Sequence, residues 1–363
     1  MRRLGRIERY VLVQTLRSLA VALGVIAAVI MLIDFVEISR SIGAETDLSA
    51  FQLLGLTVLK SPATILELLP FVFLFGTLAA FVGLNRRSEL IAMRAAGVSA
   101  WRFVLPAAGA ALAVGVLTVA IANPVASWGD GLFQRREQAL TGSAPEAAEA
   151  VWLREGSGQR QMVIRAESLN RATGVFRDVS FFIYVPSGRL RGFTERIDAA
   201  TATLSPGNWK LTDAVSASSG KQGVRYASLS LPSDLTEEEA FEQFAPPEAT
   251  PFWSLPAQIA RIEAAGFTST GHRLRFQQLL ATPLLFAAMS VLAAAFSLRL
   301  MRLGDLARMS VAAVLLGFGF FFINQFTAAY GSAEVIPPVL AAWLPPVLAA
   351  LSALTLLFYT EDG

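Results

Sequence analysis

The chain contains no cysteine, a single histidine and few charged residues. Without cysteine there is no disulfide, no thiolate nucleophile and no cysteine-ligated metal. One histidine, His272, excludes a His-rich zinc site within the chain. The sequence also lacks a complete phosphate-binding loop, a Gly-x-Gly-x-x-Gly turn after a strand, and a His-Glu-x-x-His motif. These absences argue against an enzyme, and we expect no catalytic residues, no cofactor and no metal.

Charged residues make up only 16% of the chain, whereas 54% of the residues are hydrophobic. An ordinary soluble domain is about a quarter charged. The formal net charge is only +2, and the arginines cluster at the ends of apolar runs, which is typical of membrane topology rather than of a nucleic-acid-binding surface. The composition therefore predicts an integral membrane protein with no nucleic-acid partner.

Long apolar runs are abundant. A bilayer core of ~30 Å requires roughly 20 apolar residues in a helix. Six stretches reach this length: Leu16–Ile38, Pro62–Leu84, Trp101–Ala122, Leu274–Leu298, Met309–Ala329 and Val335–Tyr359. The first follows several arginines, but it is too long for the apolar region of a signal peptide and no convincing cleavage site follows it. We therefore expect six transmembrane helices.

The basic residues between these runs predict the orientation. They gather before the first run, in the second connection (Arg86, Arg94) and in the fourth (Arg299), whereas the first connection has only Arg40 and Lys60. Cytoplasmic loops carry the excess of Lys and Arg. Both termini are therefore expected in the cytoplasm, and the long segment between the third and fourth runs is expected on the outer side.

That long segment, about 124–273, has a different pattern. Alternating apolar and polar residues predict strands at Gln161–Glu167, Val175–Val185, Asn208–Ala217 and Val224–Leu231. Glycine-containing turns separate the strands, which favours a sandwich, a jelly roll or an open barrel. An acidic helical segment, Ser233–Arg261, returns to the membrane. The predicted fold is an α-helical membrane protein, 1–123 and 274–363, with an inserted all-β, jellyroll-like domain.

The second connection reads as a short helix at about 86–98. Ser88 is a candidate N-cap and Gly97 a candidate terminator. Leu90 and Met93 share one face, and Glu89 and Arg94 flank it. Such a helix fits a groove on a cytosolic protein. It equally fits an amphipathic connector at the lipid headgroups, and the residues alone do not choose between these two interpretations.

The run from Glu89 to Ser99 closely resembles the signature of the LptF/LptG permeases, which are the membrane subunits of the lipopolysaccharide-export ABC transporter. The resemblance extends over nearly the whole chain. The further matching segments are Ile7-Glu8-Arg9-Tyr10, Leu69-Pro70, Ile197-Asp198-Ala199-Ala200, Trp209-Lys210-Leu211 and Leu340-Ala341-Ala342-Trp343-Leu344-Pro345-Pro346. The Met-Arg-Ala-Ala-Gly form and the closing segment favour the LptG branch over its paralogue LptF.

The resemblance implies a multi-pass protein of the Gram-negative inner membrane with a periplasmic β-jellyroll. It implies pairing with the paralogous permease LptF around a cavity for lipopolysaccharide, and contact with LptC through the first helix and the jellyroll. A dimer of the cytosolic ATPase LptB hydrolyses ATP, so this chain is non-catalytic. The residues expected to couple to the ATPase are Arg86, Arg87, Glu89, Leu90, Met93, Arg94 and Gly97.

The same resemblance implies a path for lipopolysaccharide. Family members often carry basic residues at the outer end of the first helix, but here Arg40 accompanies two acids, Asp34 and Glu37. The expected apolar wall in the fifth helix is made by Phe318, Phe321 and Phe322. On the strand Val175–Val185 the more apolar face, expected to line a trough, is that of Val179, Phe181 and Ile183.

Two other classes fit parts of the pattern. One is a membrane-anchored periplasmic sensor or assembly factor without transport activity. The other is a lipoprotein-release or cell-division permease. Those permeases usually have four spans with the outer domain after the first, so the arrangement of three spans, an inserted domain and three further spans argues against them.

Overall fold

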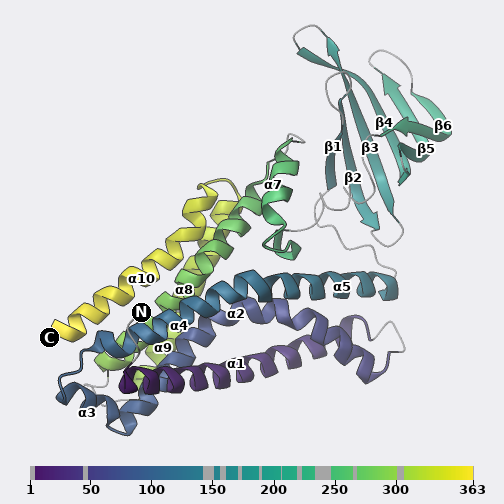
Figure 1. The fold of residues 1–363 in the computed structure, drawn as a ribbon. Coiled ribbons are helices and arrows are strands. Elements are labelled where there is room, and N and C mark those ends of the chain that lie inside the picture. Colours follow the sequence, from purple (N-terminus) through teal and green to yellow (C-terminus); the bar gives the residue numbers. More distant parts are fainter. Residues whose placement is uncertain are drawn as a thin grey trace.

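A bundle of long helices carries a β-sheet domain at one end (Figure 1). The computed structural model describes residues 5–43, 48–141, 151–155, 161–170, 174–187, 190–205, 207–218, 223–233, 247–264, 268–300 and 306–362. The predicted fold class, a helical membrane protein with an inserted all-β domain, is confirmed.

The long helices are the membrane part of the chain. They are α1 (Arg6–Ser41), α2 (Ala50–Arg86), α4 (Ala100–Leu117), α5 (Asn123–Thr141), α8 (Thr270–Leu300), α9 (Leu306–Ser332) and α10 (Pro338–Asp362). Short helices are α3 (Glu89–Ala95), α7 (Leu255–Ala264) and a 3-10 turn, η2 (Pro247–Ala249). Among the described residues, 5 helices are long and apolar enough to cross a membrane. The sixth predicted span, Met309–Ala329, lies within α9, which is not among those five.

Small residues allow the helices to approach one another closely. A Cβ at Gly76 of α2 would lie 2.9 Å from the Cα of Leu19 in α1. A Cβ at Gly115 of α4 would lie 2.5 Å from the Cα of Pro283 in α8. The hydroxyls of Thr77 and Ser290 hydrogen-bond across α2 and α8 at 3.0 Å. Close backbones and interhelical hydroxyl bonds are typical of helix packing in membranes, where the hydrophobic effect between helices is absent.

Residue 124, the predicted start of the inserted domain, lies inside a continuous helical segment. α4 continues through a π-helical turn, η1 (Thr118–Ala122), directly into α5, which ends at Thr141. Pro124 usually marks a helix break because it lacks an N–H and crowds the preceding turn. Here the π turn lies directly before it, and π turns insert into α-helices without ending them. The sheet domain therefore begins later, at β1.

The sheet domain contains one antiparallel sheet of 6 strands in the order β1-β2-β3-β4-β5-β6. The strands are β1 (Val151–Glu155), β2 (Gln161–Asn170), β3 (Val175–Ser187), β4 (Leu190–Ser205), β5 (Asn208–Ser218) and β6 (Val224–Pro232). The four predicted strands are confirmed. Each strand pairs with the next in the chain, so the described sheet is a meander. Of the predicted return segment, 234–246 lies outside the described residues, and α7 confirms its helical end.

One face of the sheet is buried around Trp209, whose side chain is fully enclosed. The rings of Phe176 and Phe181 meet it edge-on at centroid distances of 5.0 and 5.6 Å. Asp178 on β3 and Asp213 on β5 have positive φ angles of 49° and 52°. Aspartate tolerates this region better than most residues. At each of these residues the alternation of buried and exposed side chains along the strand shifts by one position. The same face of the sheet therefore stays buried on both sides of it.

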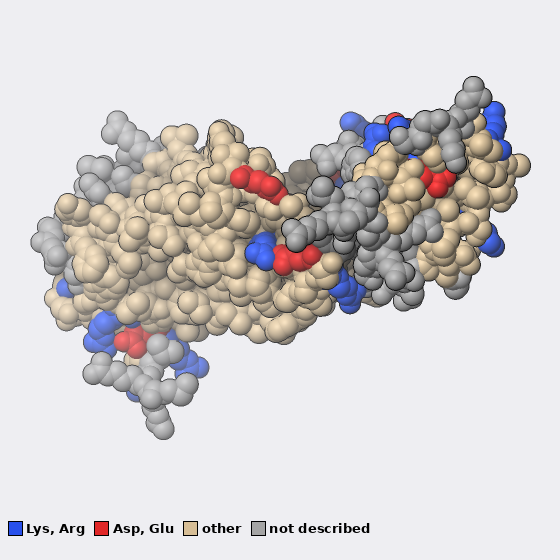
Figure 2. Space-filling model, turned by 90° about the horizontal axis from the view of Figure 1, so that it is seen from above, with Lys and Arg blue, Asp and Glu red and all other residues tan. Residues whose placement is uncertain are grey.

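The sheet domain and α3 lie at opposite ends of the helical bundle (Figure 1). On the face seen in Figure 2, most of the surface over the helices lacks charged side chains, and the few charged groups form small patches. α1 has 36 residues, or about 54 Å at 1.5 Å per residue. It is thus longer than the ~30 Å hydrocarbon core, so the long helices extend beyond the bilayer.

Candidate functional site

The short helix α3 ends as predicted, but the side chain of Ser88 does not cap its start. Ser88 stands at the N-cap position as predicted, with φ 58°, but its side chain makes no capping bond. Gly97 has φ +81° and ends the helix as predicted. The Val98 N–H bonds the Met93 carbonyl at 3.1 Å and the Gly97 N–H bonds the Arg94 carbonyl at 2.9 Å. These two bonds form a Schellman motif.

α3 is seated firmly on the membrane helices. Leu90 is 1% exposed and belongs to a core cluster with residues of α1, α2, α4, α8 and α10. Met93 packs against the same cluster. The Arg94 guanidinium donates to the Thr360 carbonyl in the last turn of α10 at 3.1 Å, where carbonyls lack helical donors. A partner protein therefore cannot contact the Leu90 side chain, because other residues of this chain enclose it.

The outer face of α3 consists of other residues. Arg86, Arg87 and Gly97, next to α3 in the chain, are exposed, and their coupling role stays a prediction. Ile91 is 60% exposed, and the sequence analysis did not select it. The sequence spacing could have identified Ile91, because position 91 lies opposite the helix face that carries Leu90 and Met93. Glu89 is half-buried, close to Tyr10 of α1.

A cavity of about 320 Å³ lies between α2, η1, α8 and α9. Its apolar wall includes Phe71, Phe286, Phe320 and Phe321, and its polar lining includes Glu67, Asn123, Arg275, Gln278 and Asn324. Of the predicted aromatic wall, only Phe321 lines this cavity. Phe318 and Phe322 are exposed outside it. A Cβ at Gly317 would lie 2.9 Å from the side chain of Leu74, so this glycine allows α9 to pack closely on α2.

A lysine from α2 pairs with the two acids near the C-terminal end of α1. Lys60 Nζ lies 2.9 Å from Glu37 Oε2 and 3.9 Å from Asp34 Oδ1. Asp34 is only 4% exposed, and a buried carboxylate requires such a partner. Arg40 is exposed. The sequence analysis used Lys60 only to orient the helices, since spacing along the chain does not show that α2 returns beside α1.

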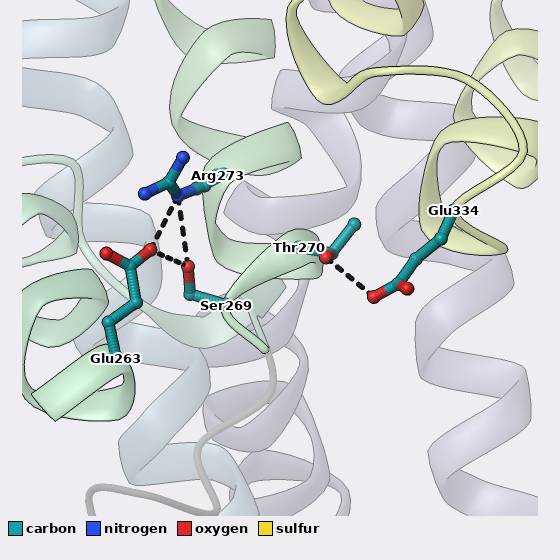
Figure 3. A network of polar contacts seen from close by, with 5 residues as sticks. All are labelled: Glu263, Ser269, Thr270, Arg273 and Glu334. Atoms are coloured by element: carbon teal, nitrogen blue, oxygen red, sulfur yellow. Dashed lines mark hydrogen bonds and ion pairs between the residues drawn. The ribbon is translucent and has the colours of Figure 1, made fainter. Parts of the chain in front are cut away.

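Two sets of polar contacts lie at the ends of the helices that are nearer the sheet domain (Figure 3). Arg273 Nε donates to Glu263 Oε1 at 2.6 Å, and Ser269 also donates to Glu263. Thr270 donates to Glu334 at 2.8 Å. The hydrogen bond from Arg273, followed by that from Ser269, lowers the pKa of Glu263 below its ordinary value. These contacts join α7, the start of α8 and the turn between α9 and α10.

In the sheet domain, Val179, Phe181 and Ile183 all lie on the buried face of β3, at 1%, 0% and 4% exposure. The trough lining that the sequence predicted for these residues stays a prediction. They pack into the core cluster around Trp209. Within the part of the chain that the structure describes, no group of three or more His, Asp or Glu side chains is arranged to hold a metal ion.

The comparisons with known proteins agree with this architecture. The family model described as lipopolysaccharide export system permease LptF/LptG matches residues 9–359. The LptG permease of Escherichia coli K12 is 24% identical over 97% of this chain and 98% of its own length. The LptG permease of Haemophilus influenzae is 23% identical over 95% of this chain and 96% of its own length. The chain belongs to the LptF/LptG family of lipopolysaccharide export permeases.

Proposed function

We propose that this chain is the LptG-type permease subunit of an ABC transporter that extracts lipopolysaccharide from the inner membrane. It pairs with the paralogous permease LptF. A dimer of the cytosolic ATPase LptB supplies the energy through α3, and LptC joins at α1 and the sheet domain. Lipopolysaccharide then passes along a periplasmic bridge toward the outer membrane. The chain itself is non-catalytic.

The observation that carries this proposal is the arrangement of α3. It is a short helix anchored by Leu90 and Arg94 in a cluster shared by five long helices, with its outer face exposed. A helix held in this way transfers force from a bound ATPase to the bundle, because close-packed interiors transmit strain. The sheet domain lies at the other end of the bundle (Figure 1), where a periplasmic bridge would begin.

The orientation is tested with introduced cysteines in this naturally cysteine-free chain. Ser88 and Ser228 are both exposed, one beside α3 and the other on β6. The assay uses right-side-out inner-membrane vesicles or cells with a permeable outer membrane. A membrane-impermeant thiol reagent added outside should label Ser228→Cys and leave Ser88→Cys unlabelled. Labelling of Ser88→Cys alone would reverse the orientation.

The coupling role is tested at Ile91. Ile91→Asp places a charge on the exposed face of α3 without touching the anchor, so the protein should fold normally but lose most of the ATPase on co-purification. Val224→Asp is the matched control, because Val224 is 51% exposed on the sheet domain. Equal ATPase recovery in both variants would contradict docking on this face and return α3 to the connector interpretation.

The substrate path is proposed to run from the cavity beside Phe321 to the buried face of β3. Exposed Arg40 is the one predicted basic group at the outer end of α1, and Lys60 is committed to Asp34 and Glu37. Phosphate groups of the lipid therefore meet Arg40 rather than the two acids. Acyl chains reach the apolar face of β3 only when the packing around Trp209 opens, and each CH₂ that they bury there contributes about 0.8 kcal/mol.

A further inference from the structure

The segment that returns from the sheet domain is fastened to the π turn between α4 and α5. The indole N–H of Trp253 donates to the Ala120 carbonyl at 3.0 Å. The backbone N–H of Phe252 donates to Asn123 Oδ1 at 2.9 Å. Both contacts join residues that lie more than a hundred positions apart in the chain. We call Asn123, Ala120, Phe252 and Trp253 the outer latch.

The chemistry of the π turn explains why the latch forms there. In an α-helix the Ala120 carbonyl would accept from the residue four positions later, which is Pro124. Proline has no N–H to give. Trp253 supplies a donor to this carbonyl from another part of the chain. π turns are frequent at functional positions, and here the turn provides the carbonyl that Trp253 binds.

Apolar contacts hold the same segment in place. The ring of Phe252 stacks on Phe276 of α8 with centroids 5.5 Å apart. Both rings pack against a small buried cluster of Val119, Leu255 and Leu279. The segment is therefore held against η1 and α8 together, immediately before α7 begins at Leu255.

The latch lies at the edge of the cavity described above. Asn123, which is 4% exposed, lines that cavity and also accepts the Phe252 N–H. Leu279 likewise lines the cavity and belongs to the cluster under Phe252. α5 leads out to the sheet domain and residues 247–264 lead back from it (Figure 1). The latch thus joins the outgoing and returning segments beside the cavity.

We propose that Trp253 and Asn123 are positioning residues that hold the base of the sheet domain at the cavity mouth, so that lipid leaving the cavity enters the sheet domain. This inference rests on the proposed function. Trp253 is 66% exposed, and an exposed tryptophan at this level would otherwise serve only as an anchor among lipid headgroups. The indole N–H distinguishes the two roles, because only the latch uses it to hold a specific carbonyl.

The test compares two steps of transport in the full complex. The chain, assembled with its partner permease and ATPase in proteoliposomes containing lipopolysaccharide, carries a photo-crosslinking amino acid at Phe321 in the cavity or at Ile183 on β3. Each probe is combined with Trp253→Phe, Asn123→Ala or the control Trp128→Phe. Trp128 of α5 is also 66% exposed, so its replacement removes an indole of equal exposure outside the latch.

In the presence of ATP, we expect the ratio of capture at Ile183 to capture at Phe321 to fall roughly 2- to 10-fold in Trp253→Phe and in Asn123→Ala, as the loss of one hydrogen bond predicts. Trp128→Phe should leave the ratio unchanged. An unchanged ratio in both latch variants would overturn the positioning role. So would an equal loss at both probes, which indicates general destabilisation. No capture at either probe in the otherwise unmodified chain would overturn the proposed function, and the latch role with it.

Discussion

Replacing Gly97 with alanine provides a direct test of how α3 is built. Gly97 has φ +81°, and a Cβ placed there would meet nothing within 4 Å. The substitution therefore adds no clash, and its effect comes from backbone strain alone. An L-residue in the left-handed region costs about 1–2 kcal/mol. α3 has only 7 residues, too few to be stable without its caps and its anchor.

Hydrogen exchange measures this cost where it arises. The Val98 and Gly97 amides close the Schellman motif, so opening the helix end exposes both of them to exchange. A loss of about 1–2 kcal/mol corresponds to a roughly 5- to 30-fold decrease in protection. We expect this decrease in the peptide that spans α3 in Gly97→Ala, measured by mass spectrometry on the purified protein. Exchange in the sheet domain should not change.

Two further substitutions provide the controls. Asparagine tolerates the left-handed region better than alanine, so Gly97→Asn should restore much of the protection. Gly83 lies inside α2 and also has no contact within 4 Å of an added Cβ, but there alanine favours the helix by about 1 kcal/mol. Gly83→Ala should therefore not reduce protection from hydrogen exchange. Equal exchange in Gly97→Ala and the unmodified chain would refute the assigned role of this glycine.

Three other predictions concern stability. Lys60→Met should lower the free energy of unfolding by about 1–3 kcal/mol, because it leaves buried Asp34 without its cation. Adding Asp34→Asn should restore part of the lost stability, measured by thermal unfolding. Glu263 has a lowered pKa, so its bond to Arg273 stabilises the fold at pH values above 4.5, the ordinary pKa of glutamate. This stabilisation is lost as the pH falls through the lowered pKa. The difference in melting temperature between the unmodified chain and Glu263→Gln should therefore vanish in acid. Trp209→Ala should cost about 3–5 kcal/mol and make the sheet domain protease-sensitive, whereas Trp209→Phe should cost less.

The helices were predictable because long apolar runs and basic flanks are properties of consecutive residues. The sheet was harder. β4 (Leu190–Ser205) was missed because Arg191, Glu195 and Arg196 interrupt the expected alternation. The continuation of the helix to Thr141 was not predicted, because proline usually interrupts a helix and local sequence does not reveal that a π turn precedes Pro124. Local rules thus failed where a contact with a distant segment compensates for the local cost.

The candidate sites divide along the same line. The position of α3 and its terminating Gly97 followed from local sequence, and so did the buried face of β3. The pairing of Lys60 with Asp34 and Glu37 did not, since it depends on α2 returning beside α1. The bond from Trp253 to Ala120 was equally hidden. An exposed tryptophan gives no sequence signal that separates a lipid anchor from a donor to a distant carbonyl.

The contacts at the two ends of α10 link the two halves of the proposed mechanism. At one end, Arg94 of α3 bonds the Thr360 carbonyl. At the other, Glu334, just before α10, accepts from Thr270 at the start of α8, and the network of Figure 3 continues from there to α7. α10 thus has a polar contact near each end. In the proposed mechanism, a displacement of α3 either breaks the Arg94 bond or shifts α10, whose other end is joined through Glu334 and Thr270 to the start of α8.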